Sequence, residues 1–155
     1  MISTQEMRAL EDNCGIPGII LMERAGLGIA DILKEKFNLK DKRILIVAYH
    51  GNNGGDGFVA AKHLAENTEV DVLFIGDEAK LKKDALINFK KTENNETIQM
   101  LNLEAMDFSD YDIIIDAIFG TGITGEIKDP LATLIKNLSE SKAHKVSVDV
   151  PSGIN

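Results

Sequence analysis

Oxygen-bearing side chains gather in one short glycine-rich stretch, Gly51–Gly57, whose sequence is GNNGGDG. It follows the apolar run Ile44–Ala48 and precedes the apolar run Phe58–Leu64, so the predicted order is strand, loop, helix. Four glycines in seven residues predict a backbone that adopts positive φ angles and lets a ligand approach closely. Two asparagines and an aspartate add carbonyl and carboxylate oxygens. The loop is therefore suited to a phosphate, a cation or both.

Two more polar segments follow apolar runs later in the chain, and each begins with an aspartate. They are Asp116–Glu126 and Asp149–Gly153. A carboxylate that closes an apolar strand is partly desolvated, so it needs a hydrogen-bonding partner or a cation. Each aspartate could instead brace a turn, and Gly120–Gly122 and Ser152 could be simple turn formers. The three segments taken together favour a binding site.

Strand-length and helix-length segments alternate after Asp41, and these elements must position the polar segments. The expected strands are Ile44–Ala48, Val70–Ile75, Thr97–Leu101, Tyr111–Ala117 and Lys145–Val150. The expected helices are Thr4–Cys14, Pro17–Lys36, Asp56–Glu66, Ala79–Lys91 and Pro130–Glu140. Such alternation predicts right-handed βαβ units and a parallel sheet covered on both faces.

The expected fold is therefore of the α/β class, a Rossmann-like doubly wound parallel sheet in three layers (α/β/α) with strand order 3-2-1-4-5. It forms a single domain over residues 1–155. In that order the first strand lies beside the fourth, and ligands bind outside the carboxyl ends of the strands where the winding reverses. All three polar segments fall at such ends, so we expect them to meet.

Composition excludes several classes of function. The net charge is −8 and the pI is about 4.9, which argues against non-specific binding to nucleic acid or to an anionic membrane. The single cysteine, Cys14, permits no intrachain disulfide and favours a reducing compartment. The N-terminus lacks the pattern of a signal peptide, and no apolar run approaches the ~20 residues that span a bilayer. We expect a cytoplasmic protein.

Several chemistries can be weighed against these residues. The stretch Gly55–Ala60 fits the G-x-G-x-x-A dinucleotide pattern, but Asp56 would place a negative charge at the pyrophosphate. There is no P-loop lysine, and the absence of a Cys/His cluster disfavours zinc. The histidines and Ser152 form no nucleophile–base motif. Oxygen ligands from Asn53, Asp116 and the Ser152 region instead suit a hard cation.

At these residues the chain resembles the YjeF N-terminal domain family, whose enzymatic members are NAD(P)H-hydrate epimerases. The resemblance extends over nearly the whole chain, and its matching segments are Leu21–Gly26, Gly51–Gly57, Asp116–Gly122 and Val148–Gly153. It implies a Rossmann-like fold and an isomerase that interconverts the R and S hydrates of NADH and NADPH in cofactor repair. The implied partner is that small-molecule substrate, and the implied cofactor is a potassium ion.

The resemblance also implies roles for individual positions. The residues that would contact the hydrated dinucleotide are Asn52, Asn53, Gly54, Gly55, Asp56, Gly120, Thr121, Gly122, Ile123, Thr124, Gly125, Glu126 and Asp149. The residues that would help to bind K⁺ are Asn53, Asp116 and Ser152. Epimerisation requires a hydroxyl to leave a carbinolamine carbon and return on the other face. Our hypothesis is that Asp149 moves the proton and stabilises the cationic intermediate.

The chain departs from the family pattern at two places. Tyr49-His50 stands where the family often has Gly-Pro, and the last motif lies close to Asn155, whereas family members usually continue with further strands. Two other functions remain open: a non-catalytic binding or scaffold domain of this family, and a conventional NAD-dependent dehydrogenase. The sequence also leaves open a homodimer and the choice between the NADH and NADPH hydrates.

Overall fold

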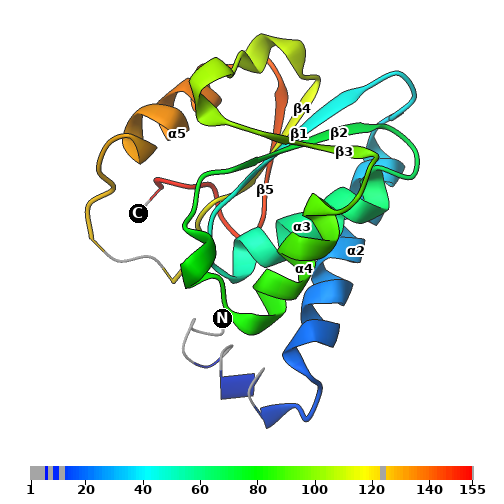
Figure 1. Ribbon diagram of the computed structural model, residues 1–155, viewed down its shortest axis with the longest axis vertical. Coiled ribbons are helices and arrows are strands. Elements are labelled where there is room, and N and C mark those ends of the chain that lie inside the picture. The colour runs from blue at the N-terminus through cyan, green and yellow to red at the C-terminus, as the bar shows by residue number, and fades with distance from the viewer. Residues whose placement is uncertain (1–5, 7–8, 11–12, 123–124, 155) are drawn as a thin grey trace.

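Five parallel strands form a single sheet in this computed structural model, which describes residues 6, 9–10, 13–122 and 125–154. The strands are β1 (Arg43–Ala48), β2 (Glu69–Phe74), β3 (Ile98–Leu101), β4 (Ile113–Ala117) and β5 (His144–Ser147). Their spatial order is β3-β2-β1-β4-β5 (Figure 1). The predicted order is therefore confirmed, and β3 lies at an edge of the sheet.

Helices cover both faces of the sheet, as the three-layer prediction requires. The three helices on one face are α2 (Gly18–Lys36), α3 (Asn52–Leu64) and α4 (Lys83–Glu93). The other face is covered by α5 (Leu131–Glu140) and by the short 3₁₀ helices η2 (Leu103–Ala105) and η3 (Phe108–Asp110) (Figure 1). A third 3₁₀ helix, η1 (Glu78–Lys80), precedes α4.

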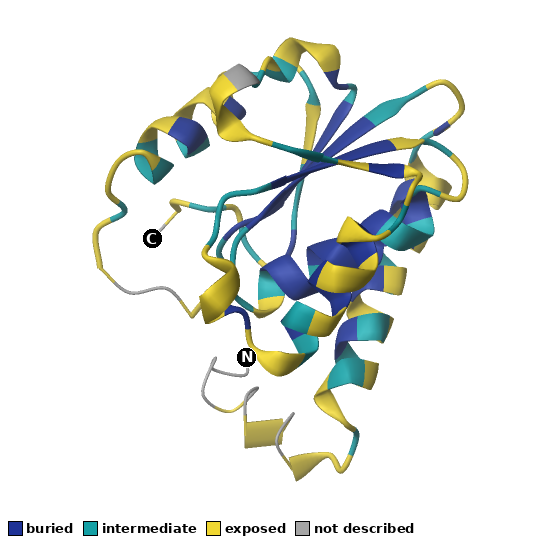
Figure 2. Cartoon of the chain, in the orientation of Figure 1, coloured by how far each residue is buried: buried dark blue, intermediate teal, exposed yellow. Residues whose placement is uncertain are grey.

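Successive side chains of β1 point to opposite faces of the sheet, so this strand contributes to the hydrophobic core on each face. Ile44, Ile46 and Ala48 belong to the core beneath α3, whereas Leu45 and Val47 belong to the core beneath α5. All five are fully buried, and strands buried on both faces are typical of parallel sheets (Figure 2). Burial of each such side chain contributes about 1.5–3 kcal/mol relative to exposure.

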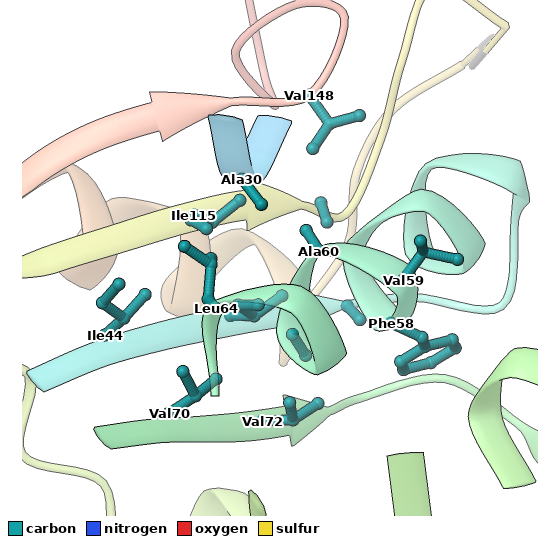
Figure 3. Close-up of a cluster of buried hydrophobic side chains, with 14 of the residues drawn as sticks. Ala30, Ile44, Phe58, Val59, Ala60, Leu64, Val70, Val72, Ile115 and Val148 are labelled. Carbon is teal, nitrogen blue, oxygen red and sulfur yellow. The ribbon is translucent and has the colours of Figure 1, made fainter. Parts of the chain in front are cut away.

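The larger core centres on α3, which lies directly over the sheet. Phe58 and Leu64 point from α3 onto side chains of β1, β2 and β4 (Figure 3). The ring of Phe58 also packs against those of Phe74 and Phe89, with centroids 5.8 and 5.4 Å away. The buried part of α3 fixes its axis, so its first turn is held rigidly at the carboxyl edge of β1.

Three predicted element bounds are wrong, and a fourth prediction is only partly covered by the described residues. The helix expected from Asp56 starts at Asn52, and the strand expected to reach Val150 stops at Ser147. The helix expected over Ala79–Lys91 is divided, because Leu81 adopts an extended backbone (φ −62°, ψ 127°) between η1 and α4. Of the first expected helix, Glu6, Ala9, Leu10 and Asn13 are helical, and residues 4, 5, 7, 8, 11 and 12 lie outside the described residues.

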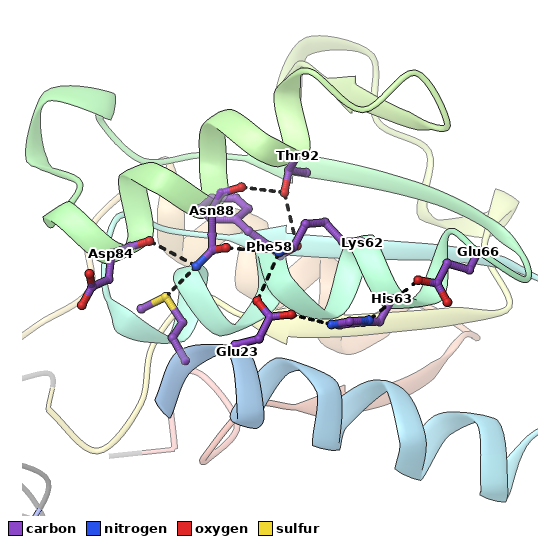
Figure 4. A network of polar contacts seen from close by, with 9 residues as sticks. Glu23, Phe58, Lys62, His63, Glu66, Asp84, Asn88 and Thr92 are labelled. Carbon is purple, nitrogen blue, oxygen red and sulfur yellow. Dashed lines mark hydrogen bonds and ion pairs between the residues drawn. The ribbon is translucent and has the colours of Figure 1, made fainter. Parts of the chain in front are cut away.

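A polar cluster joins the three helices on the α3 side of the sheet (Figure 4). Glu23 of α2 accepts hydrogen bonds from Lys62 Nζ at 3.3 Å and contacts His63 Nε2 at 2.7 Å, both on α3. Lys62 also donates to Asn88 Oδ1 of α4 at 3.2 Å. We call Glu23, Lys62, His63 and Asn88 the helix cluster. Within it, the carboxylate has two basic neighbours.

Among the described helices, none has both the length and the apolar character needed to cross a membrane.

Candidate functional site

The glycine-rich stretch does not form the loop that its composition predicts. Gly51 is the N-cap of α3, and the residues from Asn52 onward are helical. None of its glycines has a positive φ angle; the described glycines that do are Gly15, Gly125 and Gly153. The predicted left-handed backbone is therefore wrong.

Close packing, rather than unusual dihedral angles, accounts for these glycines. A Cβ on Gly54 would overlap the carbonyl oxygen of Tyr49, and one on Gly57 would lie 2.8 Å from Cβ of Ala117. A Cβ on Gly55 would lie 2.6 Å from Sδ of Met22, on the side facing α2. The glycines thus let the start of α3 press against the ends of β1 and β4 and against α2. The sequence also predicted that these glycines allow a close approach to the backbone. The structure shows such an approach, but by other parts of the protein and not by a ligand.

The first turn of α3 presents N–H donors that lack an intrahelical acceptor at the carboxyl edge of the sheet. No side chain caps this helix, and Gly55 N–H donates to Gly51 O at 3.2 Å as the first backbone bond of the turn. The N–H groups of Asn52, Asn53 and Gly54 therefore have no intrahelical acceptor. Such groups, with the positive end of the helix dipole, favour a phosphate.

Asp116 lies at the end of β4 and is only 5% exposed. Its Oδ2 accepts a bond from Ser152 N at 2.7 Å, and its Oδ1 accepts from Ser152 Oγ at 2.7 Å and from Ile118 N at 3.2 Å. Ser152 Oγ in turn accepts a bond from Phe119 N at 3.0 Å. This network ties the segment after β5 to the segment after β4.

Asp149 is exposed and lies two residues beyond the end of β5. It adopts φ 69°, which a residue other than glycine rarely does, and its Oδ2 accepts a bond from Thr121 N at 2.8 Å. A Cβ added to Gly120 would lie 2.5 Å from that Oδ2 and 2.8 Å from Asn53 Nδ2. Strained backbone that holds a polar side chain against a second loop and a helix start is a feature of functional sites.

Asn53 connects α3 to the other two segments. Its Nδ2 donates to Val148 O at 2.9 Å, and Val148 N donates to Asp116 O at 2.9 Å. The main chain of Val148 therefore lies between the asparagine and the buried aspartate. Asn53, Asp116, Gly120, Asp149 and Ser152 are thus brought together, and we call these five residues the rim site.

Of the other predicted contact residues, Thr121 bonds directly to Asp149 through its backbone N–H, and the rest of those described lie farther from the rim site. Gly55 faces α2, whereas Asn52, Thr121, Gly122, Gly125 and Glu126 are exposed. Asp56 is half-buried at the start of α3. Ile123 and Thr124 lie outside the described residues.

The rim site carries negative charge without a basic neighbour. Among the described residues, no Lys, Arg or His forms an ion pair with Asp116 or Asp149, whereas Glu23, Asp71 and Asp112 each have one. The described residues also contain no group of three His, Cys, Asp or Glu side chains arranged for a metal ion. The rim site offers carboxylate, amide and hydroxyl oxygens instead, a donor set that fits a hard monovalent or divalent cation and not zinc.

A row of aromatic rings lies beside the rim site, and the sequence did not predict it. The Tyr49 ring lies 3.8 Å from the His50 ring and 5.2 Å from the Phe119 ring, centroid to centroid. Burial, and secondarily the charge of Lys80, lower the pKa of His50 below its ordinary value. The only signal in the sequence is the Tyr49-His50 pair itself, because Phe119 is 70 residues away along the chain.

Two cavities open away from the rim site. One, of ≈ 590 Å³, lies at the amino ends of β4 and β5 and is lined by Phe37, Lys42, Lys142 and His144 among others. The other, of ≈ 360 Å³, lies between α5 and the η2–η3 segment. Neither contains a rim-site residue, and the carboxyl ends of parallel strands, not their amino ends, are where α/β sheets bind ligands.

A doubly wound parallel sheet with three polar segments at its carboxyl edge defines the Rossmann-like class of ligand-binding α/β proteins. A model of the family described as "YjeF-related protein N-terminus" matches residues 18–155. The chain belongs to this family.

Relatives and a solved structure agree with that assignment. The chain is 35% identical to NAD(P)H-hydrate epimerase of Oenococcus oeni, covering 99% of this chain and 75% of that protein. It is 37% identical to the bifunctional NAD(P)H-hydrate repair enzyme Nnr of Archaeoglobus fulgidus, of which it spans 32%. The crystal structure of yeast ynu0 superposes with a TM-score of 0.83 at 25% identity, covering 99% of this chain and 71% of that one. The predicted family and fold are therefore confirmed.

Proposed function

We propose that this protein is an epimerase that interconverts the R and S hydrates of NADH and NADPH. The relatives named as epimerases support the activity, since the alignment with the Oenococcus oeni enzyme includes almost the whole chain. The observation that carries the proposal is the position of Asp149. Its carboxylate is held at a left-handed backbone position against Gly120 and Thr121, beside Asn53, with no basic partner among the described residues.

The start of α3 is suited to the charged part of the substrate. The free N–H groups of Asn52, Asn53 and Gly54 favour a pyrophosphate, and no basic residue is needed there. The pyrophosphate seated on this turn would leave one nucleotide beside Asp149 and the other on the opposite side of α3. The proposal places the hydrated nicotinamide ring beside Asp149.

The reaction requires one C–O bond to break and to form again on the other face of the ring. The lone pair of the ring nitrogen forms a C=N bond as the hydroxyl takes a proton and leaves as water, which gives an iminium cation. Water then adds to the opposite face and loses its proton. In the proposal, the carboxyl group of Asp149 gives its proton to the departing hydroxyl and is then the anion that stabilises the iminium cation. The carboxylate takes a proton back from the water that adds to the opposite face.

We also propose K⁺ as the cofactor of the rim site. Asp116 oxygens accept three hydrogen bonds, and a carboxylate has about four acceptor positions, so one remains for a cation. Asn53 Oδ1 and Ser152 Oγ would supply further oxygen ligands. A bound cation would offset the charge of the buried carboxylate and of the substrate phosphates.

The direct test is incubation of the purified protein with the R hydrate of NADPH, followed by chromatographic separation of the two epimers. We expect conversion to the equilibrium mixture faster than the spontaneous rate in a protein-free control. Exchange of K⁺ for tetramethylammonium should lower the rate. Binding without conversion would contradict the proposal and favour the scaffold function.

A further inference from the structure

The rings of Phe119, Tyr49 and His50 form a row that crosses the carboxyl edge of the sheet. Tyr49 is in contact with both of the others, and among the described residues His50 makes no ring contact except with Tyr49. His50 is therefore an end of the row. Tyr49 and His50 are half-buried, so neither residue lies entirely within the core.

The two ends of the row lie beside different strands. At one end, Phe119 N donates to Ser152 Oγ at 3.0 Å, which places this residue next to the rim site after β4 and β5. At the other end, Asp77 N, just after β2, donates to His50 Nδ1 at 3.3 Å. Between them, Tyr49 N donates to Ala117 O at 3.4 Å. The row thus runs from the proposed reaction centre toward β2, past the start of α3.

The bond from Asp77 N fixes the tautomer of His50. Because Nδ1 accepts a hydrogen bond, the ring proton must be on Nε2. Burial, and secondarily the positive charge of Lys80, lower the pKa of this imidazole, which favours the neutral ring. A flat aromatic ring of this kind is suited to stack against a nucleobase.

We propose that His50 and Tyr49 form the platform on which the adenine ring of the dinucleotide hydrate stacks. The inference rests on the proposed function, because it takes the dinucleotide as the ligand. With the reacting ring at Asp149 and the pyrophosphate at the first turn of α3, the adenosine half falls on the β2 side of that turn. His50 directly precedes Gly51, the N-cap of the helix, so its ring lies where that half must pass.

This assignment gives a role to the pair Tyr49-His50 that no part of the reaction uses. Stacking of a base on an aromatic ring tolerates any base but requires a flat partner. The platform therefore contributes to affinity for the adenosine half and not to the proton transfer at Asp149. Removal of the platform should therefore weaken substrate binding without lowering the rate at which the bound substrate is converted.

Calorimetric titration with AMP and with nicotinamide mononucleotide tests the platform without any turnover. For His50→Ala and Tyr49→Ala we expect the Kd for AMP to rise about tenfold, as for loss of one stacked base, with the Kd for nicotinamide mononucleotide unchanged. His50→Phe keeps a ring and should retain the AMP affinity. His144→Ala is the matched control, since that histidine contacts the ring of Phe37 at the amino end of β5.

Kinetics with two substrates complete the test. His50→Ala should raise the KM for the hydrate of NADPH about tenfold with kcat unchanged, and should leave the KM for the hydrate of reduced nicotinamide mononucleotide as in wild type. An unchanged AMP affinity in both alanine variants would overturn the platform, as would equal losses for AMP and nicotinamide mononucleotide. A protein that binds AMP through His50 but does not convert the hydrate would contradict the proposed function and leave the platform standing.

Discussion

The rim site and the helix cluster both bury part of a carboxylate, yet they stabilise it in different ways. In the helix cluster, Glu23 contacts two basic side chains, Lys62 and His63. In the rim site, Asp116 and Asp149 are held by N–H and hydroxyl donors, and among the described residues neither has a basic partner. The negative charge of a carboxylate that is paired with a basic side chain is already compensated, so it attracts a cationic ligand only weakly. Because the rim carboxylates have no such partner among the described residues, we propose that they interact with a potassium ion and with the cationic intermediate.

The largest expected effect is on turnover at the rim. Asp149→Asn should lower kcat for R-to-S conversion by about 10²–10⁴, because the amide cannot carry the proton and does not attract the iminium cation. The melting temperature should change little, since Asp149 is exposed. The measurement is the initial rate of epimer exchange by chromatography. Glu23→Gln should retain the wild-type rate, and equal losses in the two variants would remove the distinction between the regions.

The next effect tests the close packing of the first turn of α3 against the end of β1. Gly54→Ala should destabilise the fold by about 3 kcal/mol, because the added Cβ overlaps the backbone carbonyl oxygen of Tyr49. Gly28→Ala is the matched control: no atom lies within 4 Å of its added Cβ, and alanine should stabilise helix α2 by about 0.5–1 kcal/mol. Urea unfolding measures both. A neutral Gly54→Ala would show that the close contact is not what selects glycine there.

These glycines also show which features of the fold and of the site could not be predicted from the sequence. Alternating strands and helices predicted the strand order, and the polar segments predicted which ends of the strands would meet. The residue type alone could not tell whether Gly54 served a positive φ angle or a close contact, because glycine permits both. The left-handed backbone of Asp149 was equally hidden, since the strand was expected to continue to Val150. His63 contacts Glu23 from 40 positions away, a separation at which no local sequence pattern operates.

A third effect distinguishes Asp116, which we expect to stabilise the fold and bind the cation, from Asp149, which we expect to act in turnover. Asp116→Asn should lower the free energy of unfolding by about 2 kcal/mol, because one buried carboxylate oxygen becomes an NH₂ group facing hydrogen-bond donors. It should also remove the dependence of the melting temperature on K⁺. Thermal unfolding in K⁺ and in tetramethylammonium buffers measures both quantities. Equal response to K⁺ in wild type and variant would exclude Asp116 from the cation site.

The smallest effect belongs to the helix cluster and depends on pH. Burial raises the pKa of Glu23, but hydrogen bonds and charge from His63 and Lys62 outweigh it and lower the pKa below the ordinary 4.5. A lowered carboxyl pKa contributes stability that is present above the unfolded value and is lost as the pH falls through the folded value. The Glu23 side chain is 41% exposed, so solvent screens its charge and the contribution is about 0.5–1 kcal/mol.

Unfolding curves from pH 7 down to pH 3 test whether this contribution to stability is lost as the pH falls. Wild type should lose more stability than Glu23→Gln below about pH 4.5, and the two curves should converge at the acid end. Glu66→Gln, whose carboxylate is exposed and 3.9 Å from His63 Nδ1, should follow wild type. A constant difference between wild type and Glu23→Gln at every pH would mean that the charge of Glu23 contributes nothing.

The most direct test of the central claim is a crystal structure of the Asp149→Asn variant with the R hydrate of NADPH bound in the presence of K⁺. We expect the hydroxyl of the reacting carbon to lie within about 3 Å of the side chain at position 149, with the pyrophosphate on the first turn of α3. A reacting ring bound elsewhere, for example in the cavity lined by Phe37 and His144 at the opposite edge of the sheet, would contradict it.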